Sequence, residues 1–228
     1  MLYTILVMKL YAIEGTDGTG KKTQIKMLYD YMKTKYKHVH VVSFPDYDSP
    51  SSGPIKMYLS GAFGDDPHVL DAYQASTLYA ADRVCKMVKL QQELEDDAII
   101  IFDRYVQSNM LHQAGKIIGR QEREDFIRWV DNFEFNTLKL PRVDKVLFMN
   151  MPAHKAVELI NQREQLKIGD EFDKDIHEAN YTHLLNAYNA GLEASEMFGW
   201  YNINCLDEFD EILPPDKIHE KIKEVLGI

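Results

Sequence analysis

The residues best suited to chemistry form a glycine-rich run near the start of the chain, Gly15-Thr16-Asp17-Gly18-Thr19-Gly20-Lys21. Glycines let the backbone turn its N–H groups inward around an anion, and a helix that starts after the lysine adds its positive end. Lys21 supplies a point charge for the outer phosphates of a nucleoside triphosphate. A strand, GxxxxGK and a helix in this order make a P-loop, so we expect residues Gly15 to Thr23 to bind ATP. An ordinary turn is the alternative.

One position departs from that pattern. The residue after the lysine is Lys22, where a P-loop usually has Ser or Thr, and Thr23 comes one step late. The usual hydroxyl ligand of Mg²⁺ is therefore missing. We expect the metal to rely on phosphates, waters and carboxylates. Asp103, at the end of an apolar run, and Asp17, inside the loop, are the candidate metal ligands. The alternative for Asp17 is a simple turn residue.

The pattern of apolar residues predicts the elements that position this loop. Helical spacing predicts a helix over 21–35, and the long run without Gly or further Pro that starts at Pro67 predicts a second helix over 67–95. Short apolar or β-branched runs predict strands over 9–13, 38–44, 98–102, 145–149 and, less distinctly, 201–204. Strands that alternate with helices indicate an α/β fold, a parallel sheet with helices on both faces, which binds ligands at the carboxyl ends of its strands.

Composition narrows the class of protein. The chain has 228 residues without repeats or linkers, which fits a single domain over 1–228. A formal net charge of −10 argues against nucleic-acid binding, although a few cations can still hold one nucleotide. The two cysteines, Cys85 and Cys205, indicate no disulfide framework and fit a reducing, cytoplasmic compartment.

The apolar start of the chain, residues 1–8, lacks the basic region and cleavage site of a signal peptide and is too short to cross a membrane. We interpret it as a lead-in to the first strand, with Met8 as an alternative start.

Four stretches together resemble the thymidylate kinase family of P-loop nucleoside monophosphate kinases. They are Ile13-Glu14-Gly15-Thr16-Asp17-Gly18-Thr19-Gly20-Lys21, Phe44-Pro45, Ala80-Ala81-Asp82-Arg83 and Asp103-Arg104-Tyr105-Val106-Gln107-Ser108-Asn109. Asp175-Ile176-His177-Glu178 is similar to the segment that closes the lid of this family. The resemblance implies a five-stranded parallel core, ATP as donor, dTMP as acceptor, Mg²⁺ and a homodimer.

The resemblance also implies roles on the long helix. Tyr79 and Arg83 are four residues apart and so share a helix face. Tyr79 would stack on the thymine, and Arg83 would place a guanidinium beyond it, suited to an acceptor that already carries phosphate. The alternatives are a core aromatic for Tyr79 and, for Arg83, a surface ion pair with Asp82 or a neighbouring carboxylate.

After the third strand, Arg104 would hold the acceptor phosphate, because its planar fork matches phosphate oxygens. Asn109 would read the pyrimidine edge, and Gln113 the same edge or the sugar. His112 stands where many members have a tyrosine near the deoxyribose. The alternatives are a loop-bracing salt bridge for Arg104, a helix cap or turn for Asn109, and a structural role for His112.

The acceptor loop and the lid differ more from the family. Phe44 keeps its place, but the run from Asp46 to Pro50 lacks the arginine that many members carry, and Tyr47 offers the phosphate only a hydrogen bond. The candidate lid spans about 163–174, with Arg163 as its favoured cation and a solvated helix end as the alternative. Lys167, Lys174, the possible hinge Gly169 and Glu178, a possible aid to the metal through water, complete the segment.

The predicted reaction is in-line attack of a nucleotide phosphate oxygen on the γ-phosphorus of ATP, with Lys21, Arg104, Asp17 and Arg163 as catalytic residues. The attacking oxygen is already ionised, so positioning and charge neutralisation replace a strong general base. Two alternatives stay open. A deoxynucleoside kinase of related fold would need a carboxylate base near a sugar hydroxyl, and a P-loop protein that binds nucleotide without transferring phosphate would fit Lys22.

Overall fold

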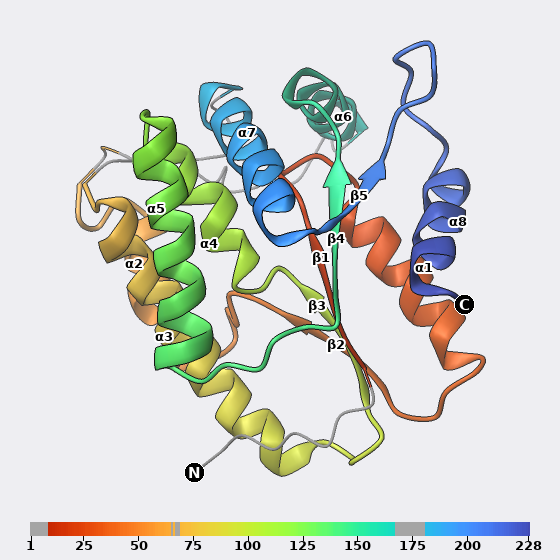
Figure 1. Cartoon of the computed structure of the whole chain (residues 1–228), viewed down its shortest axis with the longest axis horizontal. Coiled ribbons are helices and arrows are strands. Elements are labelled where there is room, and N and C mark those ends of the chain that lie inside the picture. The colour runs from red at the N-terminus through yellow and green to blue at the C-terminus, as the bar shows by residue number, and fades with distance from the viewer. Residues whose placement is uncertain (1–8, 65, 67–68, 167–180) are drawn as a thin grey trace.

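The computed structural model describes residues 9–64, 66, 69–166 and 181–228; for 163–166 it describes the backbone only. Its centre is one sheet whose strands are all parallel, in the order β2-β3-β1-β4-β5 (Figure 1). This confirms the five-stranded parallel sheet, with strand bounds shifted by one residue or less. The strands are β1 (Lys9–Glu14), β2 (Val39–Ser43), β3 (Ile99–Asp103), β4 (Lys145–Asn150) and β5 (Tyr201–Asn204).

Helices cover both faces of the sheet (Figure 1). The predicted long helix begins at Ala72 and not at 67, because Asp71 caps it: the Asp71 carboxylate accepts from the Gln74 N–H, and the Gln74 side chain accepts from the Asp71 N–H. The α-helices are α1 (Lys21–Lys33), α2 (Gly53–Leu59), α3 (Ala72–Glu93), α4 (Gln107–His112), α5 (Arg120–Asp131), α6 (Ala153–Leu166), α7 (Tyr181–Phe198) and α8 (Pro215–Leu226).

Alternation along the buried strands divides the core in two. Leu10 and Ala12 of β1 face a cluster completed by α3, α4, α5 and α7, whereas Tyr11 and Ile13 face a cluster completed by α1 and α8. Each central strand is thus apolar on both faces, as a sheet covered on both sides requires. None of the helices in the described ranges is long and apolar enough to cross a membrane.

The register of the sheet brings the candidate functional segments together at one edge. Asp103, the last residue of β3, pairs with Ile13 of β1 and with Ser43 of β2. The glycine-rich loop after β1, the segment after β2 and the segment that starts with Arg104 therefore leave the sheet side by side. This is the carboxyl edge, where ligands of such sheets bind.

Candidate functional site

The glycine-rich loop after β1 is shaped to surround an anion. Gly18 and Gly20 have φ angles of +83° and +80°, which favour glycine, and a Cβ on Gly18 would lie 2.4 Å from the Ala156 carbonyl oxygen. Lys21 is buried, and its ammonium donates to the carbonyl oxygens of Gly15 at 2.8 Å and Thr16 at 2.7 Å. The loop and its cation are therefore held together before any phosphate arrives.

Burial lowers the pKa of Lys21 to about 8, and the nearby Arg104 guanidinium lowers it further against the opposite pull of Asp17 and Asp103. The charge on Lys21 is thus costly in the free protein. A phosphate group beside it would favour the charged form.

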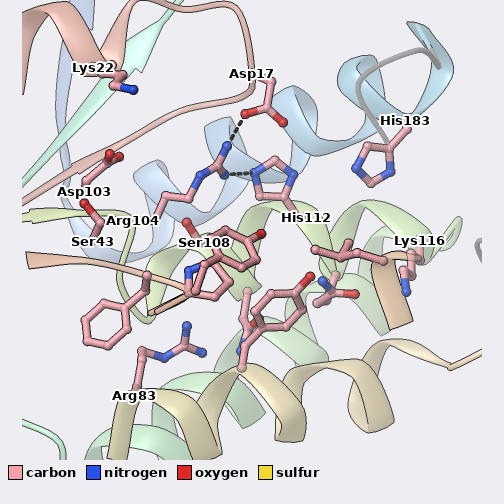
Figure 2. A pocket seen from close by; sticks show the side chains of 17 residues that line it. Asp17, Lys22, Ser43, Arg83, Asp103, Arg104, Ser108, His112, Lys116 and His183 are labelled. Atoms are coloured by element: carbon pink, nitrogen blue, oxygen red, sulfur yellow. Dashed lines mark hydrogen bonds and ion pairs between the residues drawn. The ribbon is translucent and has the colours of Figure 1, made fainter. Parts of the chain in front are cut away.

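Arg104 joins the end of β3 to the loop. Its Nη2 donates to the Asp17 carboxylate, and its Nη1 lies 2.7 Å from His112 Nε2 (Figure 2). Burial would raise the pKa of Asp17, but Arg104 and Lys21 outweigh it and hold that pKa below its usual range. Asp17 therefore stays ionised between two cations.

His112 completes this group. Burial and the Arg104 charge hold its pKa well below the usual value, so the ring is neutral. Because arginine has only donors, Nε2 of His112 must accept and Nδ1 carries the hydrogen. The ring also stacks on His183 of α7, with centroids 5.8 Å apart.

Glu14, the last residue of β1, is completely buried behind the loop, a role that its place in the motif did not reveal. It accepts from the Tyr105 N–H at 2.5 Å and the Ser108 hydroxyl at 2.7 Å. Burial raises its pKa to about 7, even though these hydrogen bonds favour the ionised form. Glu14 ties the phosphate loop to the segment after β3.

A cavity of about 530 Å³ opens beside Arg104 (Figure 2). Asp17 reaches it from the loop, Lys22 from the start of α1 and Asp103 from the end of β3, and Lys116 and His183 line its other side. Every residue that the sequence assigns to the acceptor lines this cavity: Phe44, Tyr47, Tyr79, Arg83, Arg104, Asn109, His112 and Gln113. The sequence therefore predicts which residues come together, while their individual roles stay predictions.

Arg83 is bound differently from the ion pair that the sequence suggests as its alternative. It is 2% exposed and donates from Nε and Nη2 to both oxygens of Glu134, each at 2.6 Å. Asn109 donates from Nδ2 to the same Glu134 at 2.8 Å. The pair is buried and does not involve Asp82, and it places Arg83 beside Asn109. No motif singled out Glu134.

Asp82 instead holds the segment after β2. Its carboxylate accepts from the Asp46 N–H at 2.8 Å and from the Ser51 hydroxyl at 2.5 Å. Asp46 in turn pairs with Lys86 at 2.8 Å. The carboxylate of the ADR stretch thus positions the loop that carries Tyr47 into the cavity.

The cavity wall also contains Lys116 and His183, which the sequence did not indicate, and Gln113, which it did. Lys116 donates to the Tyr58 hydroxyl at 2.8 Å and the Leu70 carbonyl oxygen at 3.3 Å, and burial lowers its pKa to about 8. His183 was also missed. Buried Gln113 Oε1 has no hydrogen-bond partner in the described part of the chain, which suits a residue that waits for a ligand.

The candidate metal ligands are two carboxylates, and no group of three or more metal-binding side chains occurs among the described residues. Asp103 and Asp17 both line the cavity, and Lys22 and Thr23 are exposed at the start of α1. This donor set fits Mg²⁺, which keeps several waters and binds substrate phosphates with few protein ligands.

The predicted lid, about 163–174, lies mostly outside the described residues. Arg163 belongs to the last turn of α6, but its side chain is outside the described set. The range 167–180 is outside the described residues, and it contains Lys167, Gly169, Lys174 and Glu178.

Known proteins resemble this chain over most of its length. A family model described as thymidylate kinase matches residues 13–195. A thymidylate kinase of Mycobacterium tuberculosis is 30% identical over 192 residues, 84% of this chain and 87% of that protein. A probable thymidylate kinase of Methanococcus maripaludis is 27% identical over 224 residues, 96% of this chain and 98% of the relative. A thymidylate kinase structure from Candida albicans shares the fold, with a TM-score of 0.65 at 21% identity, and covers 96% of this chain and 91% of its own.

Proposed function

The chain belongs to the thymidylate kinase family, and we propose that it transfers the γ-phosphoryl group of ATP to dTMP through the residues of the cavity beside Arg104. The observation that carries the proposal is the placement of Arg104. This cation directly follows β3 and lies between the phosphate loop and the acceptor cavity, where donor and acceptor phosphates must meet. The enzyme is thus a phosphotransferase whose acceptor already carries phosphate.

The protein side of the reaction follows from charge and position. Lys21 and the loop N–H groups hold the outer phosphates of ATP, and Arg104 holds the acceptor phosphate. The two cations offset the repulsion between two anions, which is the main barrier to their approach. In the free protein Asp17 pairs with Arg104 and keeps its guanidinium turned toward the loop, until the acceptor phosphate replaces Asp17 as its partner. An ionised phosphate oxygen attacks in line without a protein base.

Mg²⁺ fits this site, and Asp103 and Asp17 are the residues that would hold it. It would neutralise charge on the donor phosphates during transfer. Arg163 is the proposed lid cation. A homodimer and a cytoplasmic location remain predictions from the resemblance and from cysteine usage.

The deoxynucleoside kinase alternative is not favoured. Its acceptor would be a neutral sugar hydroxyl, whereas Arg83 and Arg104, which both line the described cavity, suit an acceptor that already carries phosphate. A coupled ADP-release assay across thymidine, dTMP, dUMP, UMP and dCMP tests the proposal. We expect turnover with dTMP above all others and little with thymidine. Thymidine as the best acceptor, or ATP binding without any transfer, would contradict it.

A further inference from the structure

Glu134 is a completely buried carboxylate that holds two side chains of the cavity wall at once. Its Oε2 accepts from Arg83 Nε at 2.6 Å. Its Oε1 accepts from Arg83 Nη2 at 2.6 Å and from Asn109 Nδ2 at 2.8 Å. Arg83 comes from α3, Asn109 from α4 and Glu134 from the π-helical segment Asn132–Thr137. One carboxylate therefore fixes the relative placement of two separate elements.

The bond to Glu134 also decides which way the Asn109 amide faces. Asn109 Nδ2 donates to Glu134 and, at 3.3 Å, to the Ser76 carbonyl oxygen, which uses both of its hydrogens on the protein side. The oxygen Oδ1 is left for the cavity that Asn109 lines. A flipped amide would place its oxygen against the carboxylate of Glu134, where two acceptors repel. Glu134 thus makes Asn109 present an acceptor.

Arg83 is fixed in a complementary sense. Nε and one Nη2 hydrogen are used on Glu134, and Nη1 donates to the Tyr105 carbonyl oxygen at 3.3 Å. A guanidinium has five N–H groups, so two remain for a ligand. Figure 2 shows Arg83 extending from α3 toward the cavity. At this end the cavity therefore offers donors from Arg83 beside an acceptor from Asn109.

We propose that Glu134 is a positioning residue that sets this acceptor–donor pattern and so makes the cavity selective for the base of the acceptor nucleotide. The inference rests on the proposed function and deepens it. A thymine ring presents N3–H and a carbonyl oxygen, which complement an acceptor and a donor. A cytosine ring presents an unprotonated N3 and an amino group, the reverse pattern. A site with fixed polar groups rejects such a mismatch strongly, because its own groups stay unpaired.

The test is Glu134→Gln, which keeps the shape but replaces one acceptor with a donor and removes the charge. We expect the KM for dTMP to rise about tenfold to a hundredfold, the range for one lost charge-assisted hydrogen bond. The kcat with dTMP and the KM for ATP should stay within about twofold, and the preference for dTMP over dCMP should fall by about tenfold or more. An unchanged preference, with only a lower Tm or a lower active fraction, would overturn the positioning role.

Glu193→Gln is the matched control. Glu193 accepts the same two-pronged contact from Arg123, with both bonds at 2.6 Å, but neither residue lines the cavity. Its loss should leave the dTMP preference unchanged. In an Asn109→Ala background, Glu134→Gln should cost less selectivity than in the wild type, since one of the groups it positions is gone. Fully additive effects on selectivity would contradict the inference.

A measurement on the wild-type protein covers the case in which Glu134→Gln does not fold. The side-chain NH₂ of Asn109, identified by its absence in Asn109→Ala, should exchange its hydrogens slowly in the free protein because both are bonded. Exchange at the rate of a free amide would overturn the inference, even if dTMP proved to be no substrate. If the wild-type protein and the Glu134→Gln variant prefer dTMP equally, this inference is wrong while the proposed function still holds.

Discussion

Arg104 donates to the Asp17 carboxylate, an ion pair that joins the end of β3 to the middle of the phosphate loop. The backbone of Arg104 has a φ of +64°, in the left-handed region that disfavours side chains. Strained backbone of this kind is retained where the surrounding structure fixes it, often at functional sites. The strain is consistent with a position selected for where its guanidinium lies.

Two substitutions of Arg104 separate its charge from its backbone. Arg104→Ala should cost ~1.5–3 kcal/mol of transition-state stabilisation, the worth of a charge-assisted phosphate contact. In kcat/KM for dTMP this is roughly tenfold to a hundredfold. Arg104→Gly should lose as much activity. Its free energy of unfolding should nevertheless be about 1 kcal/mol higher than that of Arg104→Ala, because glycine relieves the left-handed strain. An unchanged kcat/KM in Arg104→Ala would place the acceptor phosphate elsewhere.

The pKa of Lys21 predicts a pH dependence of ATP binding. In the free protein this pKa is lowered to about 8, and bound phosphates should raise it. Above pH 8 Lys21 is mostly a neutral amine, which must take up a proton to bind ATP, so the Kd should rise with pH, by at most about tenfold per unit. Titrations from pH 7 to 9 at constant Mg²⁺ measure this. Lys21→Met is the control and should bind weakly without the slope; a flat wild-type profile would contradict the prediction.

The stacking role of Tyr79 is tested by a pair of substitutions. Its ring lines the cavity on the same helix as Arg83. Tyr79→Phe should be nearly silent, because the face of the ring makes the contact, whereas Tyr79→Ala should weaken dTMP binding by about 1–3 kcal/mol. Binding of dTMP to each variant, measured by calorimetry, decides between them. A strong loss in Tyr79→Phe with little further loss in Tyr79→Ala would mean that the hydroxyl matters and the ring does not.

Lys22 bears on how the metal is held. An ammonium cannot ligate a cation and repels one at close range. Lys22→Ser should therefore keep activity and leave Mg²⁺ dependence equal or stronger, whereas Asp103→Asn should be severely impaired. Initial rates over a range of Mg²⁺ concentrations give both results. Complete loss of turnover in Lys22→Ser would make Lys22 part of the phosphate clamp.

The fold was predictable from the sequence because its strands are short apolar runs bounded by polar residues. The predicted ends of every strand lie within one residue of the observed ends. The start of α3 was placed too early, although the signal was present: Asp71 and Gln74 have the spacing of a capping box. The cavity could be assembled from motifs, since β1, β2 and β3 all end at the same edge.

Glu134 could not be found in this way. It lies in a segment without a motif, 51 residues from Arg83 and 25 from Asn109, and only the packed structure brings the three together. The same limit explains Lys116 and His183, which reach the cavity from places that no local pattern marks. Glu14 stood inside a motif, but a buried carboxylate behind the loop is a tertiary property.

Transfer of labelled phosphate tests the central claim most directly. The wild-type protein is incubated with dTMP, Mg²⁺ and ATP labelled at the γ-phosphate, and the products are separated. We predict label in the β-phosphate of dTDP, and a loss of most of that product in Lys21→Ala with its fold, checked by circular dichroism, preserved. Label that appears only as inorganic phosphate, or a folded Lys21→Ala variant with activity near wild type, would contradict the proposed phosphoryl transfer through this loop.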